Sequence, residues 1–340
     1  MIVVEDKETN EVKQFLLVDA STKLGLVQLG TSIRAFNPER LIRFYELVAN
    51  QLFDYSTRYA TSFRFQPRRA YSYLSKPPLL ATIYESVPST TDSSWICDLF
   101  LTNPLLGISG KPLPRFQQKT NIDTSYRWAA QSQYSSRLYN VRGLQSDLET
   151  QPGWGCRLNS KNLKGVFKGK LRDTLIASIV SREPIFLNIE QEQDLEPLLE
   201  WLVITKEANL PQPELVLSVP SFKDKEQVIM ALLEIPRTRL LTSGATIGTL
   251  SSIINKLKAQ KGKMHWSEKI VFGSSYPETQ LGDSVTEILS FFLSRNLGAT
   301  SKEIQRILGG NILSLLPPRP RFLKLKSSEG SVHAEGKLGE

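Results

Sequence analysis

Histidine and cysteine are scarce in this chain of 340 residues, which has two of each. Cys97 and Cys156 cannot form a disulfide framework, and neither has a histidine or a second cysteine at metal-ligand spacing. His265 lies in a Lys-Met-His-Trp segment and His333 in a polar tail, so neither belongs to an expected strand end. Zinc is usually held by such nitrogen and sulfur ligands. We therefore expect no metal and no other cofactor.

Long apolar runs are also missing. No segment approaches the roughly 18 consecutive apolar residues that would cross a bilayer. The first ten residues, MIVVEDKETN, carry acids where a secretory signal needs positive charge and a long apolar core. We expect no membrane association and a cytoplasmic location.

Charge of one sign is in excess, with a formal net charge of +8. Basic residues cluster at 64–69, 161–170 and 256–263. Each cluster can also be a solvated surface, and no helix-turn-helix, zinc finger or aromatic RNA-binding signature accompanies them. Nucleic acid is therefore not the expected partner. If it did bind, the affinity would fall steeply with salt.

The sequence does contain apolar strand-like runs that alternate with amphipathic helix-like runs, a pattern typical of parallel βα units. A content of 40% hydrophobic residues is enough for a large core. We predict an α/β protein, a (β/α)8 TIM-type barrel, with one domain over 1–316 and a mobile polar tail over 317–340. Strands are predicted at 15–18, 95–101, 137–142, 163–167, 184–189, 215–219, 238–242 and 270–272. Helices are predicted at 38–52, 122–136, 171–181, 194–205, 223–233, 247–258, 285–293 and 302–308.

The segment 269–277, KIVFGSSYP, predicts a buried strand that breaks at Gly273 into a loop. It resembles the amidohydrolase-related proteins, metal-dependent hydrolases and decarboxylases in which this strand ends Gly-Ser-Asp-Tyr-Pro and a later helix carries Gly-Gly-Asn-Ala. The position of the family's acid is Ser275. The resemblance therefore implies that the general base is absent. The residues that match are Gly273, Ser274, Tyr276, Pro277, Gly309, Gly310 and Asn311.

Other strand ends extend the resemblance. The family opens with a strand ending Asp-x-His-x-His-x-Gly, and this chain has VDASTKLG, in which Asp19 matches while Ser21 and Lys23 stand at the two histidine positions. The segment 162–166, NLKGV, resembles the family's Gly-Leu-Lys-Gly-Val strand. At the next two strand ends, Asn188 and Val219 stand where the family has histidines.

The resemblance implies a barrel that has lost its metal ligands and base, and we expect a non-catalytic ligand-binding or interaction protein with no catalytic residue. The former ligand positions would line a pocket, in which Lys23 could hold a small anionic ligand. Self-association or a complex with another protein is also expected. The alternative is an active hydrolase or decarboxylase of the same superfamily with an atypical site. A serine-lysine pair could supply one, although no Gly-x-Ser-x-Gly elbow is present. The expected pocket residues are Asp19, Ser21, Lys23, Asn188, Val219 and Ser275.

Overall fold

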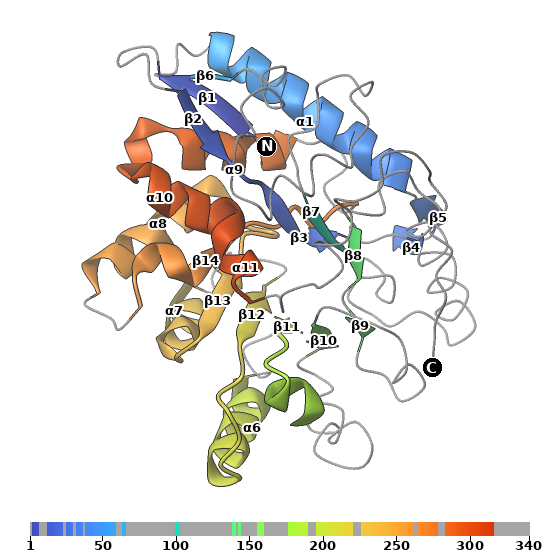
Figure 1. The fold of residues 1–340 in the computed structure, drawn as a ribbon, viewed down its shortest axis with the longest axis vertical. Helices are drawn as coiled ribbons and strands as arrows, with labels where there is room; N and C mark the ends of the chain where they lie inside the picture. The colour runs from blue at the N-terminus through green and yellow to red at the C-terminus, as the bar shows by residue number, and fades with distance from the viewer. Residues whose placement is uncertain are drawn as a thin grey trace, which may run out of the picture.

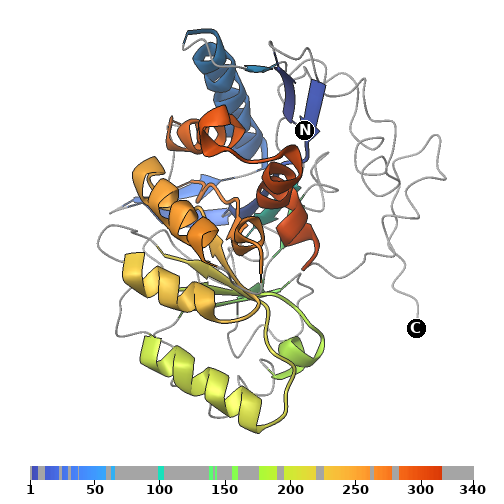
Figure 2. The same ribbon diagram turned by 90° about the vertical axis from the view of Figure 1, so that its left-hand side faces the viewer.

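The structure, a computed structural model, is a mixed α/β protein in which helices cover parallel strands (Figure 1). Figure 2 shows the helices coloured from yellow-green to orange stacked along one side of the molecule. The description covers residues 2–6, 12–22, 25–29, 32–36, 38–58, 63–65, 99–102, 138–140, 142–143, 155–159, 176–189, 195–219, 226–260, 264–277 and 283–315.

Six strands form one parallel sheet in the order β14-β13-β12-β11-β10-β9. Strands and helices alternate from β11 onward, as predicted, with α6 (Leu195–Glu207), α7 (Glu226–Glu234) and α8 (Ile247–Ala259) as the intervening helices. Most of these strands are short and apolar, as is typical of strands covered on both faces. They are β9 (Arg142–Gly143), β10 (Cys156–Asn159), β11 (Ile185–Asn188), β12 (Leu215–Ser218), β13 (Thr238–Leu241) and β14 (Ile270–Val271).

A second parallel sheet has the order β3-β7-β8, from β3 (Val18–Thr22), β7 (Leu99–Thr102) and β8 (Leu138–Asn140). Its strand β3 lies alongside the end of β14. The Ala20 amide donates to the Phe272 carbonyl over 3.1 Å, and Thr22 forms a parallel bridge with Tyr276. At the other edge, a single residue separates β8 from β9 in the chain.

Two small antiparallel groups differ from the predicted parallel pattern. The first pairs β1 (Ile2–Asp6) with β2 (Val12–Phe15) and β6 (Phe63–Phe65). The second pairs β4 (Gly25–Leu29) with β5 (Ser32–Phe36). The predicted strand at 15–18 is wrong in its bounds, because Phe15 ends β2 and β3 begins only at Val18.

The long helix α1 (Pro38–Arg58) begins at the proline, as predicted. Its predicted apolar stripe is confirmed, because Leu41, Phe44, Tyr45, Val48 and Leu52 are all buried. At the other end of the chain, α9 (Asp283–Leu293) precedes α10 (Ser301–Gln305), one turn of π-helix (Arg306–Gly310) and α11 (Asn311–Leu313).

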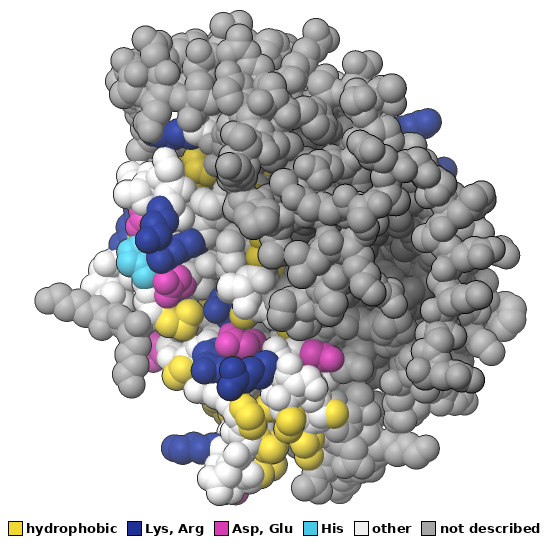
Figure 3. All heavy atoms as spheres, in the orientation of Figure 1, with side chains coloured by type: hydrophobic (Ala, Val, Ile, Leu, Met, Phe, Trp, Pro, Cys, Tyr) yellow, Lys and Arg dark blue, Asp and Glu magenta, His cyan; other side chains and the backbone are white. Residues whose placement is uncertain are grey.

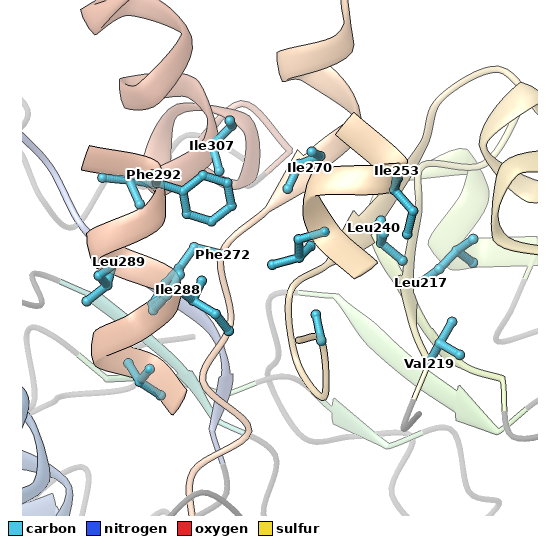
Figure 4. Close-up of a cluster of buried hydrophobic side chains, with 14 of the residues drawn as sticks. Leu217, Val219, Leu240, Ile253, Ile270, Phe272, Ile288, Leu289, Phe292 and Ile307 are labelled. Atoms are coloured by element: carbon cyan, nitrogen blue, oxygen red, sulfur yellow. The ribbon is translucent and has the colours of Figure 1, made fainter. Parts of the chain in front are cut away.

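The main core lies between the parallel strands and these helices. Leu217 and Leu240 from the strands pack in one cluster with Ile253 of α8 and Phe292 of α9 (Figure 4). Successive strand residues point to opposite faces. The alternate residues Phe186, Val216, Leu241 and Val271 are buried outside this cluster, on the other face of the sheet. Both faces are therefore covered.

Several expectations fall wholly or partly outside the described residues. They include the helix at 122–136, the strand at 163–167 with its NLKGV match, and the tail at 317–340. The helix predicted at 171–181 is seen over 176–180. Strand β10 was not predicted, and the strand expected in this part of the chain was placed at 163–167.

Candidate functional site

The carboxyl ends of the parallel strands carry hydrogen-bonding residues without charge. Six strands, β3, β7, β8, β10, β11 and β12, end in serine, threonine or asparagine. Pairing places them in register, with Thr102 between Thr22 and Asn140, and Asn188 between Asn159 and Ser218. This pattern was not predicted from the sequence, although β7, β11 and β12 are apolar runs that end in one small polar residue.

Asp19 is completely buried and holds three segments of the chain together. Its Oδ1 accepts hydrogen bonds from the amides of Ser21, at 3.0 Å, and Ser274, at 2.9 Å. Its Oδ2 accepts from the hydroxyl of Tyr45 on α1, at 2.6 Å, and from the hydroxyl of Ser274. Two oxygens of a carboxylate offer about four acceptor sites, so all of them are used by the protein. Asp19 is a clamp between β3, α1 and the loop after β14.

Burial raises the pKa of Asp19 above its ordinary value of 3.8, because the charged form loses its hydration. The hydrogen bonds from Ser274, Tyr45 and Ser21 act in the opposite direction and offset part of this effect. Burial likewise raises the pKa of the nearby Tyr276, whose ring packs against Phe44 of α1 with centroids 4.9 Å apart. The surroundings of the clamp are therefore dry and apolar on the side of α1.

The loop after β14 is fixed by its neighbours. Gly273 accepts a hydrogen bond from the Thr242 hydroxyl at its carbonyl, over 3.1 Å, and donates its amide to the same hydroxyl, over 3.0 Å. The Ser274 hydroxyl accepts from the amide of Tyr276 over 3.0 Å. Ser275 follows with φ of 59°, in the left-handed region that non-glycine residues rarely adopt. This is the position at which the amidohydrolase resemblance expects an acid.

Gly273 brings two serines close together. A Cβ at this position would lie 3.0 Å from the Cβ of Ser21 and 2.9 Å from the Oγ of Ser243. Both serines are buried. Within the described part of the chain, the Ser243 hydroxyl has no hydrogen-bond partner. A buried hydroxyl left in this state is costly, so it is available to a further polar group.

The structure describes two of the three other predicted pocket residues, Asn188 and Val219. Asn188 ends β11 and is 8% exposed, in register with Ser218 of β12. Val219 follows Ser218 and lies in the core between sheet and helices, with Leu217 (Figure 4). Alternation therefore places Ser218, not Val219, on the same face as Asn188. Lys23 lies outside the described residues, between β3 and β4.

The Gly-Gly-Asn segment supports this region from the opposite end of the strands. A Cβ at Gly309 would come within 2.9 Å of the Leu16 carbonyl, so only glycine allows this approach of the helix to β3. Asn311 donates its side-chain amide to the carbonyls of Ser267, at 2.6 Å, and Ile270, at 2.7 Å. Gly309 and Asn311 therefore hold the C-terminal helical segment against β3 and β14.

Charge is nearly absent from the site as described. Asp19 is the one acidic residue within the described strands of the two parallel sheets. In the part of the chain that the structure describes, no three histidine, cysteine or acidic side chains gather where they could hold a metal ion. The same part contains no helix that is both long and apolar enough to span a bilayer. The described residues of this arrangement can donate and accept hydrogen bonds.

No protein-family model matches the chain, and no curated protein matches it. Solved structures give distant likenesses. One is a protein from Acinetobacter baumannii described as a 2-pyrone-4,6-dicarboxylic acid hydrolase with citric acid bound. It is 12% identical, with a TM-score of 0.47, and the match covers 88% of this chain and 98% of that protein. A metal-dependent hydrolase from Lactobacillus casei is 12% identical with a TM-score of 0.41, covering 89% and 95%.

A uronate isomerase from Bacillus halodurans is 10% identical with a TM-score of 0.42, covering 89% of this chain and 93% of its own. All three TM-scores are below 0.5.

Proposed function

We propose that the chain is a (β/α)8 barrel of the amidohydrolase type that binds a small ligand without catalysing a reaction. The strand pairings support closure of the barrel. Strand β3 pairs with β7, and β7 with β8. Strands β9 to β14 continue in order, and the contacts of Ala20 and Thr22 return to β3 from the segment after β14. Counting β8 and β9 as one interrupted strand gives eight.

The ligand would lie at the carboxyl ends of the strands, where barrels of this type hold their sites. There, Asn188, Ser218, Ser21 and Ser243 supply uncharged donors and acceptors. Ser218 takes the place that the sequence assigned to Val219. Lys23 comes directly after β3 in the chain and would add a cation, which favours a small anionic ligand such as a carboxylate or phosphate.

The hydrogen bonds that Asp19 accepts are the main support for a protein that does not catalyse a reaction. It is the only described carboxylate at these strand ends, and both of its oxygens are occupied by protein donors. A metal ligand or a general base needs a free lone pair that faces the substrate. Serine and asparagine at the neighbouring strand ends are poor substitutes for histidine as metal ligands.

Thermal unfolding with inorganic phosphate, malonate and uncharged glycerol tests the ligand class. A ligand at ten times its Kd stabilises the folded state by about 1.4 kcal/mol. We expect phosphate or malonate to raise Tm and glycerol to have no effect at the same concentration. Asn188→Leu and Lys23→Met should each abolish the rise, whereas Lys302→Met, at an exposed lysine on α10, should leave it unchanged.

Two results would contradict the proposal. Stabilisation that survives both Asn188→Leu and Lys23→Met would place the anion elsewhere. Hydrolysis or decarboxylation that a chelator abolishes and a divalent metal restores would support the active enzyme with an atypical site instead.

A further inference from the structure

Exposed hydrophobic side chains gather on one corner of the molecule. On α6, Leu199 is 51% exposed, Val203 53% and Ile204 44%, and Val180 at the end of the helical segment 176–180 is 57% exposed. Figure 3 shows a yellow area of hydrophobic side chains at the bottom, over the place of α6 in Figure 1. A gathered apolar surface of this kind marks an interaction site, whereas single exposed residues such as Leu47 on α1 are ordinary.

Helix α6 is apolar on opposite sides. Leu198 and Trp201 are buried against the body of the protein, while Leu199 and Val203 face away from it. The outer face of α6 is defined here as Leu199, Glu200, Val203, Lys206 and Glu207. It exposes two large apolar side chains among three charged ones.

Two of the three charges on this outer face lie symmetrically about Val203, whereas the third, Glu207, has Leu199 at its mirror position. Glu200 lies three residues before Val203 and Lys206 three residues after it, and all three are exposed. Residues three apart share one side of a helix. If two α6 helices meet antiparallel about a twofold axis at Val203, Glu200 of each copy faces Lys206 of the other. The surface is thus complementary to itself, which an isologous dimer contact requires.

We propose that α6 pairs antiparallel with α6 of a second copy of this chain, with Val203 packed against its counterpart on the axis and Glu200 paired with Lys206 on both sides. The proposal rests on exposure and charge alone and is independent of the ligand site. The contact is a single pair of helices, smaller than a standard interface, so we expect a weak dimer with a Kd in the micromolar range.

Sedimentation velocity of the full chain from about 1 to 200 µM tests the dimer over the range expected for a small interface. Val203→Glu places two like charges near the axis and should raise Kd at least about tenfold. Leu47→Glu makes the same kind of change on α1, outside the proposed contact, and should leave Kd unchanged. Far-UV circular dichroism and Tm confirm that each variant is folded.

Charge reversal tests the pairing itself. Glu200→Lys creates two Lys-Lys contacts per dimer and should weaken association by about threefold to tenfold. Adding Lys206→Glu restores opposite charges on both sides, so the double variant should return to within about twofold of the wild-type Kd.

Three outcomes would overturn the proposal. The first is a chain that stays monomeric over the whole range, and the second is a dimer that responds equally to Leu47→Glu and Val203→Glu. The third is a monomer that binds phosphatidylcholine vesicles through Val203, which would assign the surface to lipid.

Discussion

Removing the carboxylate of Asp19 should destabilise the protein strongly. In Asp19→Ala, the buried amides of Ser21 and Ser274 lose their acceptor, at about 1–3 kcal/mol for each stranded group. The hydroxyls of Tyr45 and Ser274 can rotate and bond to each other, which limits the additional loss. We therefore expect a decrease of about 3–5 kcal/mol in the free energy of unfolding, similar to breaking a buried charged pair.

Urea unfolding followed by tryptophan fluorescence measures this change, since the chain has five tryptophans. Tyr45→Phe is the milder variant, and losing one hydrogen bond to a carboxylate should cost about 1.5–3 kcal/mol. Tyr276→Phe is the matched control. Tyr276 belongs to the same aromatic cluster, and its hydroxyl bonds to no residue in the described part of the chain. Removing this hydroxyl should lower the free energy of unfolding by less than about 0.5 kcal/mol.

The clamp would be refuted if Asp19→Ala changed the free energy of unfolding by less than about 1 kcal/mol. Equal effects of Tyr45→Phe and Tyr276→Phe would also refute it. If Asp19→Ala does not fold, the comparison of the two tyrosine variants still decides the question.

Three further predictions concern the same region. The pKa of Asp19 is raised in the folded state, so the stability that its protonation contributes is present below about pH 3.8 and is lost as pH rises through the folded pKa. The destabilisation caused by Asp19→Asn, measured by urea titration, should therefore grow as pH falls from about 7 to about 4. Gly273→Ala should cost about 1–3 kcal/mol in Tm-derived stability because its Cβ would meet Ser243, whereas Gly248→Ala on α8, with open space around it, should stabilise by about 0.5–1 kcal/mol. Asn311→Ala should cost about 2–3 kcal/mol on chemical unfolding, through two lost hydrogen bonds, to the carbonyl of Ser267 before β14 and to that of Ile270 at its start.

Strands and helices could be predicted from the sequence where burial produces a regular pattern of apolar residues. Strands such as 184–189 and 215–219 are apolar runs bounded by turns, and the stripe on α1 repeats with helical period. The antiparallel pairs β1–β2 and β4–β5 were missed because their pairing is decided by contacts that a βα pattern does not contain.

The site was predictable only in part. Side chains alternate between the two faces of a strand, so a shift of one residue exchanges the faces. For this reason Ser218, and not the predicted Val219, lies on the same face as Asn188. The clamp joins Asp19 to Ser274, 255 residues later in the chain, so no local signal could reveal it. The resemblance did identify Asp19, Gly309 and Asn311 as special positions, but contacts were needed to show that they stabilise the fold.

The metal content of protein purified without chelator tests the central claim most directly. Inductively coupled plasma mass spectrometry should find less than about 0.1 equivalent of zinc, manganese, iron or nickel per chain, because the described strand ends lack free ligands of the usual types. About one equivalent of a single metal that remains after dialysis and is lost in Asn188→Leu would contradict the account.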